Sequence, residues 1–240
     1  MRRWLERIGN WSAAAMGTGA LAATAIAIRT AMTGDEFNFA SARVEIVGGA
    51  RTDEEALGKS IREAAAGAMT TNKLALANIG DIAARIKKTG WVKNVAVRRE
   101  YPRRLAAYVE PKNIIATWSN GREHIPVDEN GEAVREETDK AFPPMLYGED
   151  APEKAPALLR TLASYPPLLS NLAAAERVSG TRWNITLYDA DDGLVIMLSA
   201  EDAQRSVDEI AALDRKGDIL KRKISAIDAR IPDKIMVKPK

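Results

Sequence analysis

Residues 94–118 read NVAVRREYPRRLAAYVEPKNIIATW, and this stretch decides the fold. Apolar residues alternate with others over 95–97 and again over 105–109, which predicts two strands. The residues Tyr101-Pro102-Arg103 between them predict a turn, so the two strands form a hairpin. Glu110-Pro111-Lys112 then ends the hairpin, and the apolar run IIATW begins the sheet of a second domain. The stretch is therefore a domain junction.

Four arginines, Arg98, Arg99, Arg103 and Arg104, crowd around this turn. Basic clusters beside aromatic residues can bind nucleic acid, but they also form the solvated rim of hairpins. The formal charge of the chain is +2, and residues 1–34 alone carry four arginines against one glutamate. The remainder is nearly neutral and offers little attraction for phosphates. We therefore interpret Arg98, Arg103 and Arg104 as a hairpin rim and expect no nucleic-acid partner.

The residues before the hairpin predict a compact β-α-α-β-β module. ARVEIVGG, residues 42–49, reads as a strand. Thr52 and Glu55 have the spacing of a capping box and predict a helix that Gly67 stops. A second helical pattern starts near Ile79 and ends at Gly90. Two helices of this size can cover one face of a three-stranded sheet.

After residue 113 the pattern changes to short strands and turns. Asn120-Gly121 and Asn130-Gly131 are strong hairpin signals. This half predicts a mostly antiparallel β domain with flanking helices, so the chain as a whole is α+β. The predicted strands are 114–118, 124–128, 132–134, 182–188, 193–199, 224–231 and 234–238, and the predicted helices are 155–164 and 202–217.

The N-terminal segment predicts the compartment. Between Arg7 and Arg29 lie 21 residues without a charge, about 31 Å of helix and thus close to the thickness of a bilayer core. The preceding arginines place that end in the cytoplasm. We predict a single-pass type II protein with a cytoplasmic tail at 1–7, a transmembrane helix at 8–32 and a spacer at 33–41. A cleaved signal peptide ending near Ala25 or Ala27, or a soluble alanine-rich helix, would also fit.

The sequence contains few motifs that indicate a catalytic, metal-binding or cofactor-binding site. The chain has no cysteine, and its single histidine, His124, reads as an ordinary strand residue. DADDG at 189–193 lacks the spacing of a calcium loop and predicts a hairpin turn. No phosphate-binding loop or nucleophile elbow occurs. We expect no catalytic, cofactor-binding or metal-binding residue, no cofactor and no small-molecule substrate, and hence no enzyme.

The whole arrangement resembles the FtsQ/DivIB cell-division family, and the small module resembles a POTRA domain. The matching residues are FASARVEIVGGARTDEEAL at 39–57, followed by Trp91-Val92, an R-x-x-P-x-x-L pattern from Arg99 to Leu105, and Val109-Glu110. PVDENGEAV, LYGEDAP, RWNITLYDADDGLVIMLS and ISAIDARIPDKIMVK then follow the family's second domain in order. Asn113 departs from the family, which usually has proline at this point.

The resemblance implies a non-enzymatic divisome scaffold of the inner membrane at the division septum, with a POTRA-like domain at 42–112 and a periplasmic C-terminal β domain at 113–240. Its partners would be FtsB-like and FtsL-like bitopic division proteins, with other divisome components possible, and it would contact membrane lipid through one span. The alternative is a cleaved periplasmic binding or chaperone-like protein that uses a POTRA module.

The resemblance also implies a partner-binding site, where the partner adds a strand to the C-terminal strand. Arg230 would pair with a partner carboxylate, and Arg182 matches a second such arginine. The lysines and the proline of this stretch are typical guards of a sheet edge, which is equally consistent with mere protection against aggregation. The implied site residues are Arg182, Arg230, Ile231, Asp233, Lys234, Ile235, Met236, Val237 and Lys238.

Overall fold

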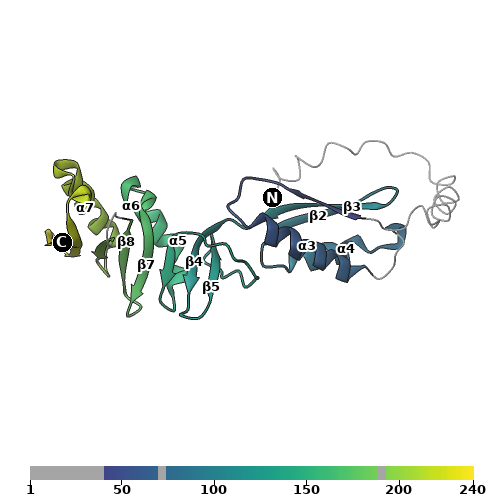
Figure 1. Cartoon of the computed structure of the whole chain (residues 1–240), viewed down its shortest axis with the longest axis horizontal. Coiled ribbons are helices and arrows are strands. Elements are labelled where there is room, and N and C mark those ends of the chain that lie inside the picture. Colours follow the sequence, from purple (N-terminus) through teal and green to yellow (C-terminus); the bar gives the residue numbers. More distant parts are fainter. Residues whose placement is uncertain (1–40, 70–73, 189–192) are drawn as a thin grey trace.

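The computed structural model describes residues 41–69, 74–188 and 193–240. These residues form an elongated molecule, with a three-stranded sheet toward one end and an eight-stranded sheet toward the other (Figure 1). The predicted transmembrane segment at 8–32 lies outside the described residues. Within the described ranges, no helix has the length and apolarity needed to cross a bilayer.

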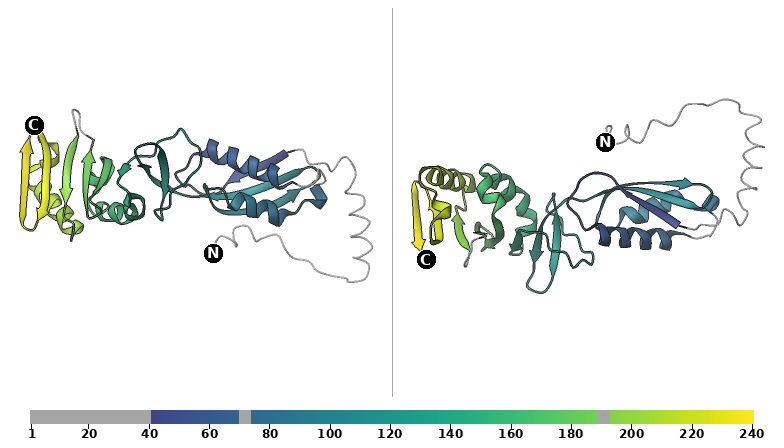
Figure 2. Two further views of the ribbon diagram at one scale, coloured as in Figure 1. Left: turned by 90° about the horizontal axis from the view of Figure 1, so that it is seen from below. Right: turned by 45° about the horizontal axis from the view of Figure 1, so that its top comes forward.

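The small sheet consists of β1 (Ser41–Ile46), β2 (Val92–Glu100) and β3 (Arg104–Pro111) in the order β1-β3-β2. β1 runs parallel to β3, with Ser41 opposite Arg104, and β2 forms the predicted antiparallel hairpin with β3. Two helices, α3 (Glu54–Ala68) and α4 (Ile79–Lys87), lie on one face of this sheet, and the short helix η2 (Leu74–Leu76) precedes α4 (Figure 2). The predicted order of strands and helices in this module is confirmed.

The start of α3 differs from the prediction by one residue. Asp53, not Thr52, is the N-cap, and its carboxylate accepts from the amides of Glu55 and Ala56 at 3.1 and 3.2 Å. Thr52 is buried and its hydroxyl makes no hydrogen bond within the described residues. The helix also continues past Gly67 to Ala68, because Ala68 is buried in the core. Local capping signals gave the helix, and tertiary packing set its ends.

The core of the small module draws on residues from beyond its own sheet. Leu57 and Ile61 of α3 and Ile82 and Ile86 of α4 pack with Trp91, which is fully buried. The same cluster contains Ile114, Val134 and Phe142, all of which lie past the end of β3. The two parts of the molecule therefore share a core at their junction.

The large sheet has the order β11-β10-β9-β8-β7-β6-β4-β5. It is mixed, because the pairs β4–β6, β6–β7 and β9–β10 are parallel while the other four are antiparallel. Helical crossovers allow two of these parallel pairs, because α5 and α6 connect β6 to β7 and α7 connects β9 to β10, whereas β5 and the segment after it connect β4 to β6. The strands are β4 (Ile114–Ser119), β5 (His124–Asp128), β6 (Met145–Tyr147), β7 (Leu172–Val178), β8 (Arg182–Leu187), β9 (Leu194–Leu198), β10 (Ile224–Ile231) and β11 (Lys234–Pro239).

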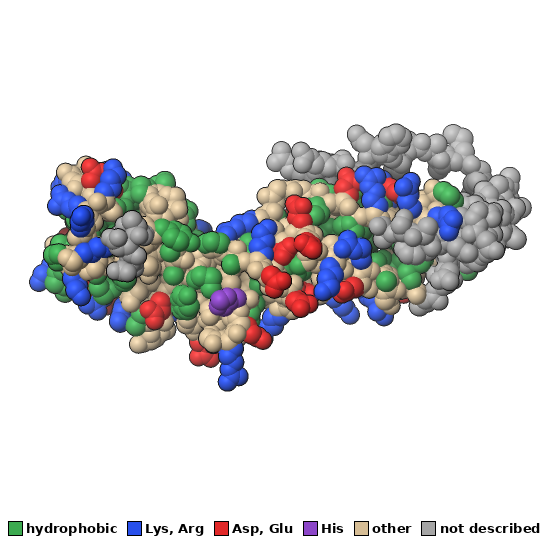
Figure 3. All heavy atoms as spheres, in the orientation of Figure 1, with side chains coloured by type: hydrophobic (Ala, Val, Ile, Leu, Met, Phe, Trp, Pro, Cys, Tyr) green, Lys and Arg blue, Asp and Glu red, His purple; other side chains and the backbone are tan. Residues whose placement is uncertain are grey.

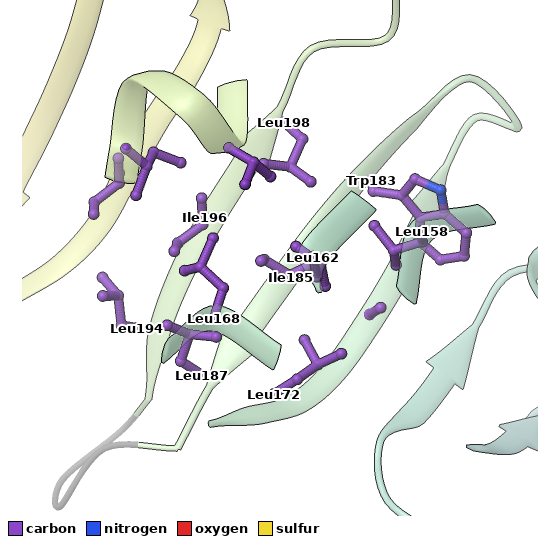
Figure 4. Packing of buried hydrophobic residues seen from close by; sticks show 14 of the residues in the cluster. Leu158, Leu162, Leu168, Leu172, Trp183, Ile185, Leu187, Leu194, Ile196 and Leu198 are labelled. Carbon is purple, nitrogen blue, oxygen red and sulfur yellow. The ribbon is translucent and has the colours of Figure 1, made fainter. Parts of the chain in front are cut away.

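Helices α5 (Ala151–Leu162), α6 (Pro166–Ser170) and α7 (Ala203–Gly217), with the short η3 (Ile219–Lys221), accompany this sheet. Leu162 and Leu168 from the helices pack into one cluster with Ile185 and Ile196 from the sheet (Figure 4). The strands β6 and β7 and the helix α6 were not predicted. The predicted strand at 132–134 forms only an isolated bridge, between Ala133 and Val127.

A strap, residues 129–142, runs from the large sheet over the small module. The carboxylate of Glu136 accepts from the amide of Gly90 at 2.8 Å, and the hydroxyl of Thr138 donates to Asp53 at 2.6 Å. At the end of the strap the ring of Phe142 lies 6.4 Å from that of Trp91, centroid to centroid. The strap therefore ties the two sheets together through both polar and apolar contacts.

We predict that Phe142→Ala destabilises the small module. Phe142 comes after β4 and β5 of the large sheet in the chain, but its side chain lies in the core of the small module. Truncating a fully buried phenylalanine costs about 3–5 kcal/mol in the free energy of unfolding. Denaturant unfolding followed through tryptophan fluorescence measures this, because Trp91 is the ring's neighbour. Tyr188→Ala is the matched control, since Tyr188 is exposed and its loss should change stability by no more than about 0.5 kcal/mol. Equal effects of the two changes would contradict the shared core.

Candidate partner-binding edge

One edge of the large sheet is closed. The first residues of the strap cover the outer side of β5 with two backbone hydrogen bonds. The amide of Val134 donates to the carbonyl of Pro126 at 2.8 Å, and the amide of Asp128 donates to the carbonyl of Glu132 at 3.0 Å. Pro126 itself has no amide hydrogen to offer a further strand. A second chain therefore finds little free backbone on this side.

The other edge is open. β11 pairs with β10 on its inner side, and no described residue forms a strand on its outer side. Met236 and Val237 on β11 expose 41% and 46% of their surface, and Ile231 at the end of β10 exposes 48%, whereas Ile235 is partly buried against the core. Unpaired edge backbone beside exposed apolar side chains is a template for strand addition. The stretch that the resemblance singled out thus lies along the open edge of the sheet.

Basic side chains accompany this edge. Lys234 and Lys238 are exposed on β11, and Lys and Arg side chains gather at this end of the molecule, on the left of Figure 3. Positive charge discourages the edges of two copies from pairing. An incoming strand that carries acidic residues would turn the same charge into attraction.

The turn between β10 and β11 is clamped to α7. Asp233 has a left-handed backbone, with φ 59°, and its amide donates to the carboxylate of Glu209 at 3.2 Å. Arg205, one helical turn before Glu209, forms an ion pair with it at 2.8 Å and donates to the carbonyl of Arg230 at 3.3 Å. We call Arg205 and Glu209 the α7 clamp. Nothing in the sequence signalled it, because the clamp joins residues about 25 positions apart.

The structure also brings the two predicted arginines together. Arg230 binds Asp228 through two hydrogen bonds, Nε to Oδ1 at 2.8 Å and Nη2 to Oδ2 at 2.6 Å. The Arg230 hydrogen bond lowers the pKa of Asp228 below its ordinary value, more than burial raises it, and the charge of Arg182 on β8 adds to the lowering. Arg182 Nε is buried and makes no hydrogen bond within the described residues. One cation, Arg230, thus pairs with the Asp228 carboxylate beside the open edge, and the charge of a second, Arg182, also acts on it.

The remaining candidates from the sequence lie elsewhere. His124 is exposed on β5, at the opposite edge of the sheet. Residues 189–192 of the DADDG turn lie outside the described residues. Among the residues that the structure describes, no group of three or more His, Cys, Asp or Glu side chains is placed to hold a metal ion.

Comparison with known proteins agrees with this architecture. The sequence profile for the POTRA domain, FtsQ-type, matches residues 39–110, and that for Cell division protein FtsQ/DivIB, C-terminal, matches residues 116–230. The chain belongs to the FtsQ/DivIB family. The resemblance inferred from the sequence is therefore confirmed, and the small module is a POTRA domain of the FtsQ type. The chain is a member of a family of cell-division proteins.

Curated relatives in several bacteria carry the same description. Cell division protein FtsQ of Caulobacter vibrioides is 31% identical over 165 residues, 68% of this chain and 54% of the relative. Cell division protein FtsQ of Rhizobium meliloti is 26% identical over 201 residues, 83% of this chain and 62% of the relative. The chain thus spans between half and two thirds of the length of these FtsQ proteins.

We predict that the α7 clamp orders the open edge. Glu209→Ala removes the acceptor for the amide of Asp233 and the partner of Arg205, so the amides of residues 233–238 should exchange with deuterium severalfold faster. Glu209→Gln keeps a side-chain oxygen and should restore slow exchange. Asp208→Ala is the matched control, because Asp208 also receives an i,i+4 hydrogen bond on α7, from Gln204, but does not touch the turn. Unchanged exchange in Glu209→Ala would contradict the clamp.

A second prediction concerns pH. The folded state lowers the pKa of Asp228, so this group stabilises the fold above its ordinary pKa, and the contribution is lost as pH falls through the lower folded pKa, below about pH 4. Arg230→Gln should raise the pKa of Asp228, which a carboxyl NMR titration measures directly. Lys216→Gln on α7, a charge removed away from Asp228, serves as the control and should leave the titration unchanged.

Proposed function

We propose that this FtsQ-family chain is a non-enzymatic scaffold of septal cell division that binds FtsB-like and FtsL-like partners through β11. The observation that carries the proposal is the asymmetry of the large sheet. The strap covers the β5 edge, whereas β11 offers unpaired backbone and two exposed apolar side chains, Met236 and Val237, with exposed Ile231 at the end of β10. Strand addition at β11 is the interaction that this asymmetry favours.

In strand addition, the backbone supplies affinity and the side chains supply specificity. The outward amides and carbonyls of β11 would supply hydrogen bonds that any extended segment can meet. Selection among partners would come from side chains, which alternate between the two faces of the added strand. Met236 lies opposite Asp228, which in turn lies opposite Met197 on β9. An apolar partner residue opposite Met236 would therefore meet one methionine side chain, which adapts to varied shapes.

Arg182 and Arg230 would supply positive charge that complements a carboxylate of the partner. Asp228 already holds Arg230, so a partner carboxylate would share this arginine or approach the half-buried Arg182 on β8. Bidentate pairing of arginine with carboxylate fixes register as well as adding affinity. The fixed turn and the α7 clamp would reduce the entropy that the edge loses on binding.

The proposal places the chain in the inner membrane as a single-pass type II protein, with both sheets in the periplasm at the septum. Residues 8–32 would form the anchor. The competing proposal is a cleaved periplasmic binding or chaperone-like protein with a POTRA domain. N-terminal sequencing of the protein recovered from membranes separates the two, because a mature chain that lacks residues 1–27 would contradict the anchored form.

We predict that Arg230→Glu and Met236→Glu abolish capture of the FtsB-like and FtsL-like proteins of the same cell. Reversing the charge at Arg230 repels a partner carboxylate, and a glutamate at position 236 places a charge on the apolar edge. The measurement is co-purification of the tagged full-length chain in detergent. At least a tenfold loss of captured partner is expected for each variant.

The matched control is His124→Glu, which places the same new charge on the opposite edge strand. It should leave capture unchanged. Capture that survives both edge substitutions would refute the proposed role of β11. Equal loss in the control variant would refute it as well, because the effect would not belong to the edge.

A further inference from the structure

The outer end of the POTRA domain carries an exposed cluster that strand addition at β11 does not use. Tyr101, Pro102 and Arg103 form the β2–β3 turn and Arg104 begins β3, and all four are exposed. Leu76 of η2 is also exposed, at 46%, and Tyr101 exposes 47%. We call these five residues the tip surface. They include part of the arginine cluster that stood out in the sequence.

The tip surface is held in place by the fold. Arg99, beside the turn, donates to the carbonyls of Leu74 and Ala77 at 2.9 and 2.6 Å. These bonds fix η2 against the hairpin and bring Leu76 to the same end of the domain as Tyr101. Arg99 thus fixes the shape of this end of the domain, and Arg103 and Arg104 are exposed beside it.

The chain enters the POTRA domain at this same end. Ser41, the first residue of β1, lies opposite Arg104, the first residue of β3. Because β1 and β3 are parallel, both run away from the tip, and β3 leads directly to the large sheet at the other end (Figure 1). The tip surface is therefore the part of the folded chain that lies next to residue 40, and the β11 edge lies far from it.

The length of the preceding chain bounds the distance to a membrane. If the anchor ends at residue 32, residues 33–40 span at most about 29 Å when fully extended, at roughly 3.6 Å per residue. Any less extended conformation brings the tip closer. The surface that faces the bilayer would then be the one that carries an exposed tyrosine, an exposed leucine and two exposed arginines.

These side chains suit a lipid surface. Tyrosine rings prefer the interface between headgroups and acyl chains, and arginines near an anionic leaflet each contribute a several-fold increase in binding. Arg98 adds positive charge close by, although it is engaged with the ring of Tyr108 at 4.5 Å and with Glu100 at 3.8 Å. A nucleic acid would need a wider basic surface than a turn with two exposed arginines.

We infer that the tip surface rests on the headgroups of an anionic bilayer and thereby sets the orientation of the whole molecule on the membrane. This inference rests on the anchored form of the proposed function. It assigns to the arginines of the β2–β3 turn a partner, the lipid surface, that is distinct from the protein partners at β11. Because the strap joins the two sheets, contact at the tip would also hold β11 at a fixed distance from the membrane.

The absence of cysteine in the chain allows a clean test. The full-length protein with Pro102→Cys, labelled with a fluorophore, is reconstituted into vesicles that contain phosphatidylglycerol and a headgroup nitroxide quencher. The matched control is Arg122→Cys in the exposed β4–β5 turn of the large sheet. We expect at least a threefold stronger quenching at position 102 than at position 122, and a fall in that quenching in purely zwitterionic vesicles.

Charge removal completes the experiment. Arg103→Gln with Arg104→Gln should reduce the quenching at position 102 several-fold, whereas Lys216→Gln with Lys223→Gln, in the large-sheet half, should not. Equal quenching at positions 102 and 122 in a protein that floats with the vesicles would overturn the tip contact alone. A full-length chain that does not float with the vesicles would overturn both the anchor and the tip contact. Partner capture that survives both edge substitutions would contradict the proposed role of β11 alone and would leave the flotation and the quenching at position 102 unchanged.

Discussion

The ion pair between Lys112 and Asp128 joins the two sheets, and the arrangement of the whole molecule depends on that junction. Lys112 Nζ lies 2.9 Å from a carboxylate whose side chain is 1% exposed. The other oxygen of Asp128 accepts from the amides of Asn130 and Glu132, both at 2.9 Å, and so shapes the turn that begins the strap. Burial lowers the pKa of Lys112, but the contacts with Glu132 and Asp128 outweigh it and raise the pKa overall. Removing one partner of such a pair leaves a buried charge without compensation.

The strap that starts at this ion pair has two effects at once. It completes the core of the POTRA domain with Val134 and Phe142, and it closes the β5 edge of the large sheet. Both edges of a sheet must be protected, since unpaired backbone groups on an edge strand can pair with another chain. Here one edge is covered by the chain itself and the other is left open, flanked by lysines. The same segment thus stiffens the junction and restricts strand addition to the far end of the molecule.

Several features were predictable because they depend on neighbours in sequence. The β2–β3 hairpin follows from alternation on both sides of a proline-containing turn, and α3, α4 and α7 follow from helical periodicity. The strands β5 and β10 were predicted with their observed bounds. The short β6 and the alanine-rich β7 were missed, since three residues give no period and alanine has little strand preference. These two strands form the middle of the sheet only because α5 and α6 carry the chain back beside it.

The order of elements in the POTRA domain, the family and the position of an edge-like C-terminal strand were determined by the sequence itself, because they rest on local patterns and on motifs read in series. Only the tertiary structure decided that β5 is covered and β11 is open, since that depends on a strap about 100 residues away from β11. It also decided that the charge of Arg182 on β8 acts on Asp228 of β10, and that Glu209 holds the turn at Asp233. The physical reason is that these features depend on which strands become neighbours and on how the helices pack against the sheet, and no local pattern encodes strand order or register.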